Sequence, residues 1–425
     1  METRNVLQHL SADQRRRVAD IDTELERVAR EISVLRSTRR GLAEERESII
    51  SDAAPNLTGS PPEDFTQRNF DWTESLLREA QRVFGIKEFR LCQEDVCNAA
   101  MSSRDAIVVM PTGAGKSLCY QLPAIMGEKL TLVVSPLVAL INDQVINLRE
   151  KNVPCACLMG SNERAATEAV FKSIKEPSKD RPRLLYVTPE RISKSKRLLS
   201  ALDHAYKSGI LGRIVIDEAH CCSQLGHDYR PDFRRLAILR ELFPEVPIMG
   251  LTATMSPKVM HDVLNILGLQ RPTEPHAAIP GRTVYFRAPL RRHNLNFSVL
   301  PSPASKGSAS ELLVEYIMQH HPGHSGIVYC FSRKETYSTS QELERLSKGR
   351  IRAGVYNSDV SDHEKVVVHE RWRSGDIHVV CATIAFGMGI DKGNVRFVVH
   401  TCMSKSVDGY YQEAGRAGYV RADTT

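Results

Sequence analysis

The segment MPTGAGKS (110–117) carries residue types that bind phosphate groups. It follows the apolar run DAIVVM and precedes a helical stretch, and this order of strand, glycine loop and helix is what a phosphate cradle requires. Glycine lets backbone N–H groups close around phosphates, the Lys116 ammonium reaches the β- and γ-phosphates, and the Ser117 hydroxyl can ligate Mg²⁺. The strict pattern has glycine where this chain has Met110. The residues expected to bind a nucleotide here are Met110, Pro111, Thr112, Gly113, Ala114, Gly115, Lys116 and Ser117.

A second segment, RIVIDEAH (213–220), is an apolar run that ends in two acidic residues. Asp217 is placed to hold Mg²⁺ through water, and Glu218 is placed to polarise an attacking water. A strand that ends in Asp-Glu could also simply meet solvent at the edge of a sheet. The phosphate loop upstream favours the metal and water roles.

Upstream of the loop, FGIKEFRLCQ (84–93) places Arg90 and Gln93 three residues apart, on one helical face. A glutamine amide offers a donor and an acceptor together and can therefore pair with the edge of adenine. The alternative is an ordinary surface helix. Only the short distance to the phosphate loop favours a nucleotide contact.

Short apolar, β-branched runs alternate with helical stretches from about residue 80 onward, and this pattern predicts an α/β fold. Such runs are typical of strands that are buried on both faces of a parallel sheet with helices on both sides. The pattern stops in a proline-bearing stretch (270–310) that we expect to be irregular, and then restarts. We therefore predict two tandem domains of the same kind, 70–287 and 288–425. The expected strands are DAIVVM, LTLVVS, RLLYVT, RIVIDE, PIMGLT, GIVYCFS, RAGVYN, IHVVCAT and VRFVVH.

The N-terminal region (1–56) predicts a coiled-coil helix. Its apolar residues recur at alternating steps of three and four, which gives a narrow seam with charged flanks. Self-association into a homo-oligomer is the favoured interpretation, and an amphipathic helix packed on the globular body is the alternative. A linker is expected at 57–69. The seam residues are Val18, Ile21, Leu25, Val28, Ile32, Leu35, Leu42 and Ile49, with Arg39 and Arg46 at the two missed positions.

Composition narrows the class of protein. The 57 Lys and Arg residues exceed the 51 Asp and Glu residues, giving a net charge of +6 that permits a polyanionic partner without requiring one. None of the ten cysteines forms a CxxC pair, so free thiols in a reducing compartment and no zinc site are expected. The chain has no signal-peptide pattern and no run of ~18 apolar residues, so we expect an intracellular protein without a membrane partner.

The motifs, taken in their order along the chain, resemble those of superfamily 2 helicases. The phosphate loop is followed by DEAH (217–220), LTAT (251–254), CATIAFGMGID (381–391) and QEAGRAG (412–418). The segments HCCSQLGHDYRPDF (220–233) and YCFSRKE (329–335) narrow the resemblance to the RecQ family, and the heptad-bearing N-terminus is most similar to the short RecQ helicases of animals and plants. The resemblance covers about residues 70–418. It implies two RecA-like domains.

The resemblance also implies roles for individual residues. Arg90 and Gln93 match an adenine-recognition motif, and Thr252 and Thr254 match the element that links hydrolysis to movement. SPLVALINDQ (135–144) and VTPER (187–191) match segments that grip the DNA backbone. The matched residues of the hydrolytic core are Lys116, Ser117, Asp217, Glu218 and His220.

In the second domain, the resemblance implies that Asp391 faces the nucleotide and that Gln412 and Arg416 face the γ-phosphate. Arg416 would be an arginine finger, which in related ATPases contributes ~10³–10⁵ in rate. The alternative for Arg416 is a surface arginine on a helix. The implied cofactors are ATP and Mg²⁺, with Mg²⁺ held by Ser117 and Asp217.

The implied activity is ATP-dependent 3′→5′ unwinding, with single-stranded and forked DNA as partners. DNA repair or recombination in the nucleus is the implied setting. The sequence departs from the family pattern at Tyr419, where a second arginine is usual, and at Leu225, where a tryptophan is usual. The family's last strand, zinc subdomain and winged helix do not follow, so a C-terminally truncated motor is expected. Two alternatives stay open: a non-catalytic oligomerising form that binds nucleotide or DNA, and an RNA helicase of the same superfamily.

Overall fold

The computed structural model describes residues 11–28 except 15, residues 31, 35, 38 and 42, and residues 61–418 except 160–163, 176–180, 225–228, 290, 301–307, 384–385 and 387–391. Residues 1–62 and 63–425 are separate compact units. Within the described residues, no helix is long and apolar enough to cross a membrane. All ten cysteines are free thiols in this structure.

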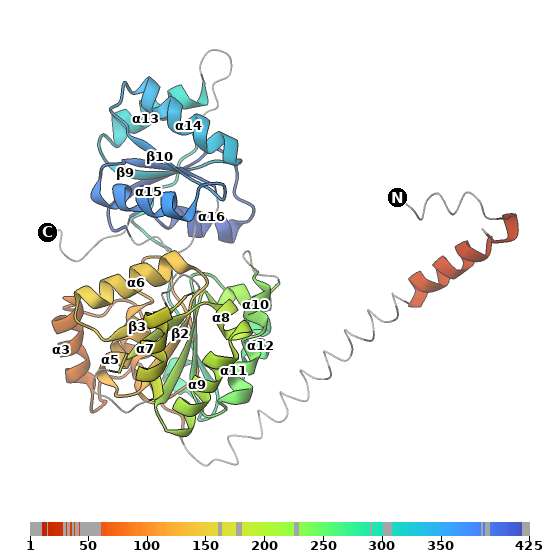
Figure 1. The fold of residues 1–425 in the computed structure, drawn as a ribbon, viewed down its shortest axis with the longest axis vertical. Coiled ribbons are helices and arrows are strands. Elements are labelled where there is room, and N and C mark those ends of the chain that lie inside the picture. Colours follow the sequence, from red (N-terminus) through yellow and green to blue (C-terminus); the bar gives the residue numbers. More distant parts are fainter. Residues whose placement is uncertain are drawn as a thin grey trace. The chain divides into compact units, whose positions relative to one another are not determined.

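The first sheet of the larger unit has eight parallel strands in the order β3-β4-β2-β5-β6-β1-β8-β7. Its strands β2 and β3 are labelled in Figure 1. The crossover between successive parallel strands requires a helix or a long connection, which explains why the helices alternate with the strands. The strands are β1 (Ala106–Val109), β2 (Leu130–Val134), β3 (Cys155–Leu158), β4 (Leu184–Val187), β5 (Leu211–Asp217), β6 (Ile248–Thr252), β7 (Pro272–Thr273) and β8 (Thr283–Arg287).

Helices cover both faces of this sheet. Ile107 and Val109 of β1 belong to one buried cluster with residues of α7, α9, α11 and α12, whereas Ala106 and Val108 belong to another with residues of α4, α5 and α6. The α-helices are α3 (Thr73–Phe84), α4 (Gln93–Met101), α5 (Leu118–Met126), α6 (Val138–Glu150), α7 (Arg164–Lys175), α8 (Pro189–Lys194), α9 (Lys196–Lys207), α10 (Pro231–Arg234), α11 (Ala237–Leu242) and α12 (Pro257–Leu267). The 3₁₀ turns are η1 (Ala219–Cys222) and η2 (Pro275–Ala277).

The second sheet has four parallel strands in the order β10-β11-β9-β12. It too is covered on both faces, because α13 and α14 share one cluster with Val328 while α15 shares another with Ile327. The elements are α13 (Ala309–His320), β9 (Ser325–Tyr329), α14 (Arg333–Leu346), β10 (Ala353–Tyr356), α15 (Asp362–Ser374), β11 (Val379–Ala382), β12 (Val395–His400) and α16 (Val407–Ala414). The two RecA-like α/β sheets confirm the predicted fold class.

The stretch 270–310 is less irregular than predicted. It contains β7 and β8, and β8 pairs with β1 in parallel over residues 284–287. The stretch 57–69, expected to be a linker, includes Phe65, which is fully buried, and Glu63, whose N–H donates to Ala278 O at 2.9 Å. The packed part of the chain therefore starts by residue 63.

The N-terminal helix is observed over residues 12–14 and 16–28, with residues 31, 35, 38 and 42 also helical. Arg27 Nη2 lies 2.5 Å from Glu24 Oε1, one of the pairs that support such a helix on its charged flank. The seam side chains of Ile21, Leu25 and Leu35 are 45, 61 and 67% exposed. Ile32, Arg39, Arg46 and Ile49 of the predicted seam lie outside the described residues.

Candidate functional site

Strand order brings the phosphate loop and the two acids to the same edge of the first sheet. β6 lies between β5 and β1, with Asp217 opposite Leu251 and Val109 opposite Thr252. The N–H of Met110 donates to Thr252 O at 3.1 Å, so the phosphate loop starts beside the end of β6. Parallel strands end at one edge, where α/β proteins place their ligand sites.

The phosphate loop has the backbone that its glycines permit. Gly113 and Gly115 both have φ +81°, in a region that residues with a Cβ rarely adopt. Lys116 Nζ lies 3.2 Å from Met110 O and 3.5 Å from Pro111 O, so its ammonium is held over the loop. Helix α5 begins directly after Ser117. Its unpaired N–H groups and partial positive charge favour a phosphate at this position.

Gln93 is part of the loop's support. Its side chain is 4% exposed, and its Nε2 donates to Ala114 O at 3.1 Å and to Gly115 O at 3.2 Å. Its Oε1 accepts from the N–H of Arg90 at 2.9 Å. A Cβ on Gly115 would lie 2.5 Å from Nε2, which explains the glycine at this position. Gln93 and Arg90 thus both lie beside the phosphate loop. The prediction that they share one helical face was wrong, because α4 begins at Gln93 and Arg90 lies in the turn before it.

Asp217 is a buried acid at the end of β5. Its side chain contacts Ser135, which directly follows the neighbouring strand β2. Its Oδ1 accepts from the N–H of Glu218 at 3.1 Å, and its Oδ2 accepts from Ser135 Oγ at 3.5 Å. Burial and the neighbouring Glu218 carboxylate raise the pKa of Asp217 to about 7, while the Lys116 ammonium acts in the opposite direction. An ionised carboxylate at this depth is costly unless a cation compensates it.

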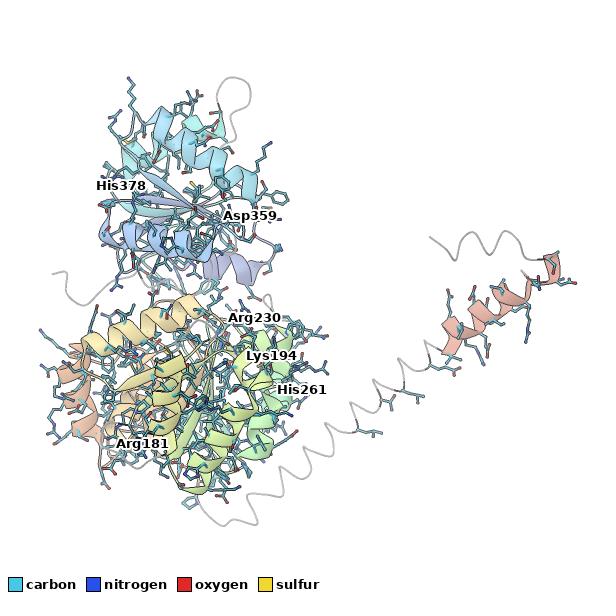
Figure 2. All side chains as sticks on the ribbon, in the orientation of Figure 1. Arg181, Lys194, Arg230, His261, Asp359 and His378 are labelled. Atoms are coloured by element: carbon cyan, nitrogen blue, oxygen red, sulfur yellow. The ribbon has the colours of Figure 1, made fainter. Side chains whose placement is uncertain are left out.

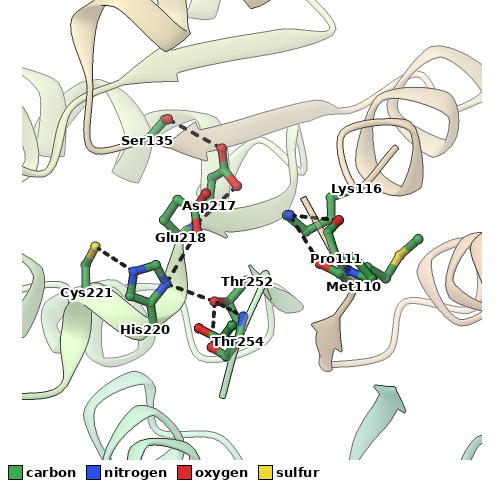
Figure 3. A network of polar contacts seen from close by, with 10 residues as sticks. All are labelled: Met110, Pro111, Lys116, Ser135, Asp217, Glu218, His220, Cys221, Thr252 and Thr254. Atoms are coloured by element: carbon green, nitrogen blue, oxygen red, sulfur yellow. Dashed lines mark hydrogen bonds and ion pairs between the residues drawn. The ribbon is translucent and has the colours of Figure 1, made fainter. Parts of the chain in front are cut away.

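Glu218 and His220 join this acid to the end of β6 (Figure 3). Glu218 has φ +51°, and its Oε2 lies 3.3 Å from His220 Nδ1. His220 Nδ1 is 2.8 Å from Thr252 Oγ1, and that hydroxyl donates to Thr254 O at 2.9 Å. Because the Thr252 hydrogen is used on Thr254, its oxygen accepts from His220, which assigns the imidazole proton to Nδ1.

The oxygen donors at this edge suit a hard divalent cation. The Asp217 carboxylate and the Ser117 hydroxyl are the oxygen types that Mg²⁺ prefers. Glu218 Oε2 is buried and lies 3.3 Å from His220 Nδ1, but it forms no hydrogen bond with the described residues, so it can accept one from a water. The residues present therefore fit a magnesium–nucleotide complex.

The predicted second-domain residues lie on α16 and the turn that follows it. Gln412 and Arg416 are 7% and 6% exposed. Glu413 Oε2 is 2.9 Å from His400 Nε2, which ties α16 to β12; although burial opposes it, hydrogen bonds from His400 and Ser404 lower the pKa of Glu413. Asp391 lies outside the described residues, as does Tyr419.

Comparisons with known proteins agree with this geometry. The DEAD/DEAH box helicase family matches residues 90–263, and the helicase conserved C-terminal domain matches residues 308–421. The mouse protein "ATP-dependent DNA helicase Q1" is 38% identical over 419 residues, which are 94% of this chain and 62% of that protein. The Xenopus laevis "RecQ-like DNA helicase BLM" is 41% identical over 87% of this chain and 26% of its own length. An Arabidopsis thaliana "ATP-dependent DNA helicase Q-like 2" is 38% identical over 94% of this chain and 56% of its own length.

The chain belongs to the RecQ family of DNA helicases. It spans about three fifths of the length of the mouse relative. Among solved structures, Mycobacterium smegmatis helicase Lhr bound to ssDNA and AMP-PNP matches with a TM-score of 0.63 at 23% identity, over 84% of this chain and 47% of that one. The DEAD-box helicase Mss116 bound to ssRNA matches with a TM-score of 0.62 at 18% identity, over 84% and 73%. These two likenesses show the fold alone.

The RecQ-type segment 220–233 contacts segment 135–144, which was expected to grip DNA, and also α8, the helix that begins within the other such segment, 187–191. Arg230 Nη1 donates to Pro136 O at 2.8 Å, and Ser193 Oγ donates to Asp232 Oδ1 at 2.8 Å (Arg230 is labelled in Figure 2). Sequence reasoning missed these contacts and also the Ser135–Asp217 contact. No local pattern marks them, because each joins residues from different strand ends. Leu225, at the usual tryptophan position, lies outside the described residues.

Proposed function

We propose that this RecQ-family chain contains the motor of an ATP-dependent DNA helicase. It hydrolyses ATP, moves 3′→5′ along single-stranded DNA and opens forked duplexes. The observation that supports this proposal most strongly is the continuous contact from Asp217 and Glu218 through His220 to Thr252. Such a network would couple the site of hydrolysis to the adjoining strand end. Relatives named as DNA helicases favour DNA over RNA as the track.

In this proposal the first domain binds and polarises the nucleotide. Lys116 and the backbone N–H groups of residues 113–117 hold the phosphates, while Arg90 and Gln93 contact adenine. For that contact, Gln93 exchanges part of its hydrogen bonding to Ala114 and Gly115 for the base. Glu218 accepts a proton from the attacking water, and His220 orients the Glu218 carboxylate.

The second domain supplies the groups that stabilise the negative charge developing on the γ-phosphate. Arg416 acts as the arginine finger, Gln412 contacts the γ-phosphate and Asp391 faces the nucleotide. A guanidinium stabilises the transition-state charge without itself losing a proton. Mg²⁺, when bound, neutralises phosphate charge; Ser117 and Asp217 are the residues that would hold it, directly or through water.

Movement on DNA requires that the hydrolytic site be connected to the DNA-facing segments. Segments 135–144 and 187–191 contact the phosphate backbone, so binding is independent of base sequence and weakens with salt. Arg230 ties segment 220–233 to Pro136 of the first segment, and Asp232 ties it to Ser193 on α8, the helix that begins within the second segment. Thr252 and Thr254 tie the acids to β6. A shift of the DNA is thereby transmitted to Glu218 and His220.

The N-terminal helix makes the protein a homo-oligomer in this proposal. A second copy of the same helix is the partner, because a narrow apolar seam with charged flanks fits another such seam. The exposure of Ile21, Leu25 and Leu35 supports this assignment. The family relationship supports action in the nucleus, in DNA repair or recombination.

ATP hydrolysis by the purified chain, with and without single-stranded DNA, tests the proposal. Lys116→Ala removes the ammonium that reaches the phosphates, so turnover should be lost while the far-ultraviolet circular dichroism spectrum stays unchanged. Turnover in Lys116→Ala close to that of the unmodified chain would overturn the assignment of the nucleotide site. DNA binding without any hydrolysis by the unmodified chain would favour the non-catalytic alternative.

A further inference from the structure

Arg292 lies on the segment between β8 and α13, and its guanidinium joins backbone groups that are far apart in the sequence. Its Nη1 lies 3.2 Å from Thr112 O in the phosphate loop and 2.5 Å from Gly415 O in the turn after α16. Its Nη2 donates to Gly418 O at 2.7 Å. One planar group thus contacts the phosphate loop and both ends of the turn that carries Arg416.

The turn itself is shaped for this contact. Gly418 has φ +70°, and a Cβ there would lie 2.7 Å from Asn294 Nδ2 and 3.3 Å from Arg292 Nη2. Asn294 Nδ2 also donates to Gly418 O. A Cβ on Gly415 would lie 3.7 Å from the Thr112 Cβ, so the turn reaches the phosphate loop itself. Glycine is needed at 418 because both its backbone conformation and its neighbours exclude a side chain.

The same residues surround a cavity beside the phosphate loop. The cavity has a volume of about 300 Å³, and its lining includes Arg90, Thr112, Gly113, Arg292 and Gly418. Arg292 is therefore at the boundary of the proposed nucleotide site. Its guanidinium donates to three backbone carbonyls of the protein, those of Thr112, Gly415 and Gly418, and this arrangement suits a role in positioning the two segments.

We propose that Arg292 is a positioning residue, which holds Gln412 and Arg416 in register with the phosphate loop. This inference rests on the proposed function, because it concerns the same hydrolytic site. A guanidinium presents several N–H groups in one plane and can serve three carbonyls at once, whereas a lysine ammonium is a point charge without that fork. The loss of this contact frees the turn after α16, and misplacement of a reacting group by 1 Å costs ~10²-fold in rate.

The test compares Arg292→Ala, Arg292→Lys and Arg287→Ala in the full chain. Arg287 is an exposed arginine at the end of β8 and does not line the cavity, so Arg287→Ala removes an equal charge and should keep normal turnover. We expect Arg292→Ala to lower kcat by ~10–100-fold while the affinity for a fluorescent ADP analogue changes little. Arg292→Lys should recover only part of the loss, because it keeps the charge and loses the fork.

A double-mutant cycle with Arg416→Ala provides the decisive readout. If Arg292 acts through Arg416, then Arg292→Ala should have little further effect on kcat when Arg416 is already alanine. Additive losses would overturn the inference, and so would a loss of ADP affinity that matches the loss of kcat. Full rescue by Arg292→Lys would show that charge alone matters and would also overturn it. Absence of turnover in the unmodified chain would instead refute the proposed function, and this inference with it.

Discussion

Thr252 is the last residue of β6, and its contact with His220 connects this strand to the acidic residue Glu218. Its hydroxyl accepts from His220 Nδ1 and from the N–H of Thr254 and donates to Thr254 O. The residue is fully buried, so no solvent can replace these bonds. When a buried donor loses its acceptor, the folded state is destabilised by the free energy needed to remove that donor from water.

Thr252→Val keeps the shape of the side chain and removes the hydroxyl, so it should lower the free energy of unfolding by about 1–3 kcal/mol. Thr283→Val is the matched control, because Thr283 Oγ1 is also buried and has no hydrogen-bond partner among the described residues. Its replacement should leave stability unchanged or raise it. Urea denaturation of both variants checks this, and equal losses would contradict the network described for Thr252.

Asp217 should make stability depend on pH in an unusual direction. Burial and Glu218 raise its pKa from 3.8 to about 7 in the folded protein. Between these values the folded chain holds a proton that the unfolded chain has lost, so this contribution to stability is present at low pH and is lost as pH rises to about 7. Asp217→Asn removes the cost of the buried charge.

We therefore expect Asp217→Asn, without nucleotide, to be more stable than the unmodified chain at pH 8, by at least about 1 kcal/mol. The difference should shrink as pH falls toward 5. Denaturant titrations of both proteins across this range measure it. A difference that is zero at pH 8, or that grows on acidification, would contradict the raised pKa.

The residues that carry the chemistry could be predicted because their neighbours along the chain identify them. Lys116 follows two glycines, and Asp217 and Glu218 end an apolar run, so their spacing alone indicated their roles. The Ser135–Asp217 and His220–Thr252 contacts could not be predicted, since they depend on which strands are adjacent. No pattern in the sequence around Arg292 indicated its contacts with the phosphate loop and with the turn after α16.

At the scale of elements, the expected strands formed because each is an apolar run that a two-sided core can bury. β3 was missed since CACL has no β-branched residue and half of its residues are partly exposed. β8 was missed because prolines surround it, although TVYFR is rich in β-forming residues. Prolines at 275, 280 and 289 lie outside β8 and do not interrupt it.

The N-terminal helix is the element whose role is tested most simply. Deletion of residues 1–56 should reduce the mass measured by sedimentation equilibrium to that of one chain, because the proposed seam is removed. Leu25→Asp places a charge on the seam and should weaken association in the full chain, whereas Ala19→Asp adds the same charge at an exposed flank position and should not. An unchanged mass after the deletion would show that the helix does not mediate self-association.

For the whole molecule, we propose that the DNA-binding segments and the site of ATP hydrolysis are connected by direct contacts between side chains and backbone. Segment 220–233, which contains His220, contacts segment 135–144 through Arg230 and contacts α8, which begins within segment 187–191, through Asp232. Single-stranded DNA bound along these segments would therefore be connected to Glu218 through a continuous series of residue contacts. This connection predicts that DNA accelerates hydrolysis and does not merely bind beside it.

The rate of ATP hydrolysis, measured with single-stranded DNA, with single-stranded RNA of the same sequence and with no nucleic acid, tests this claim most directly. Glu218→Gln provides the baseline, because it keeps the shape of the side chain and cannot accept the proton of the attacking water. We predict Mg²⁺-dependent hydrolysis that DNA stimulates clearly more than RNA does. A rate that stays at the Glu218→Gln baseline with saturating DNA would contradict the account.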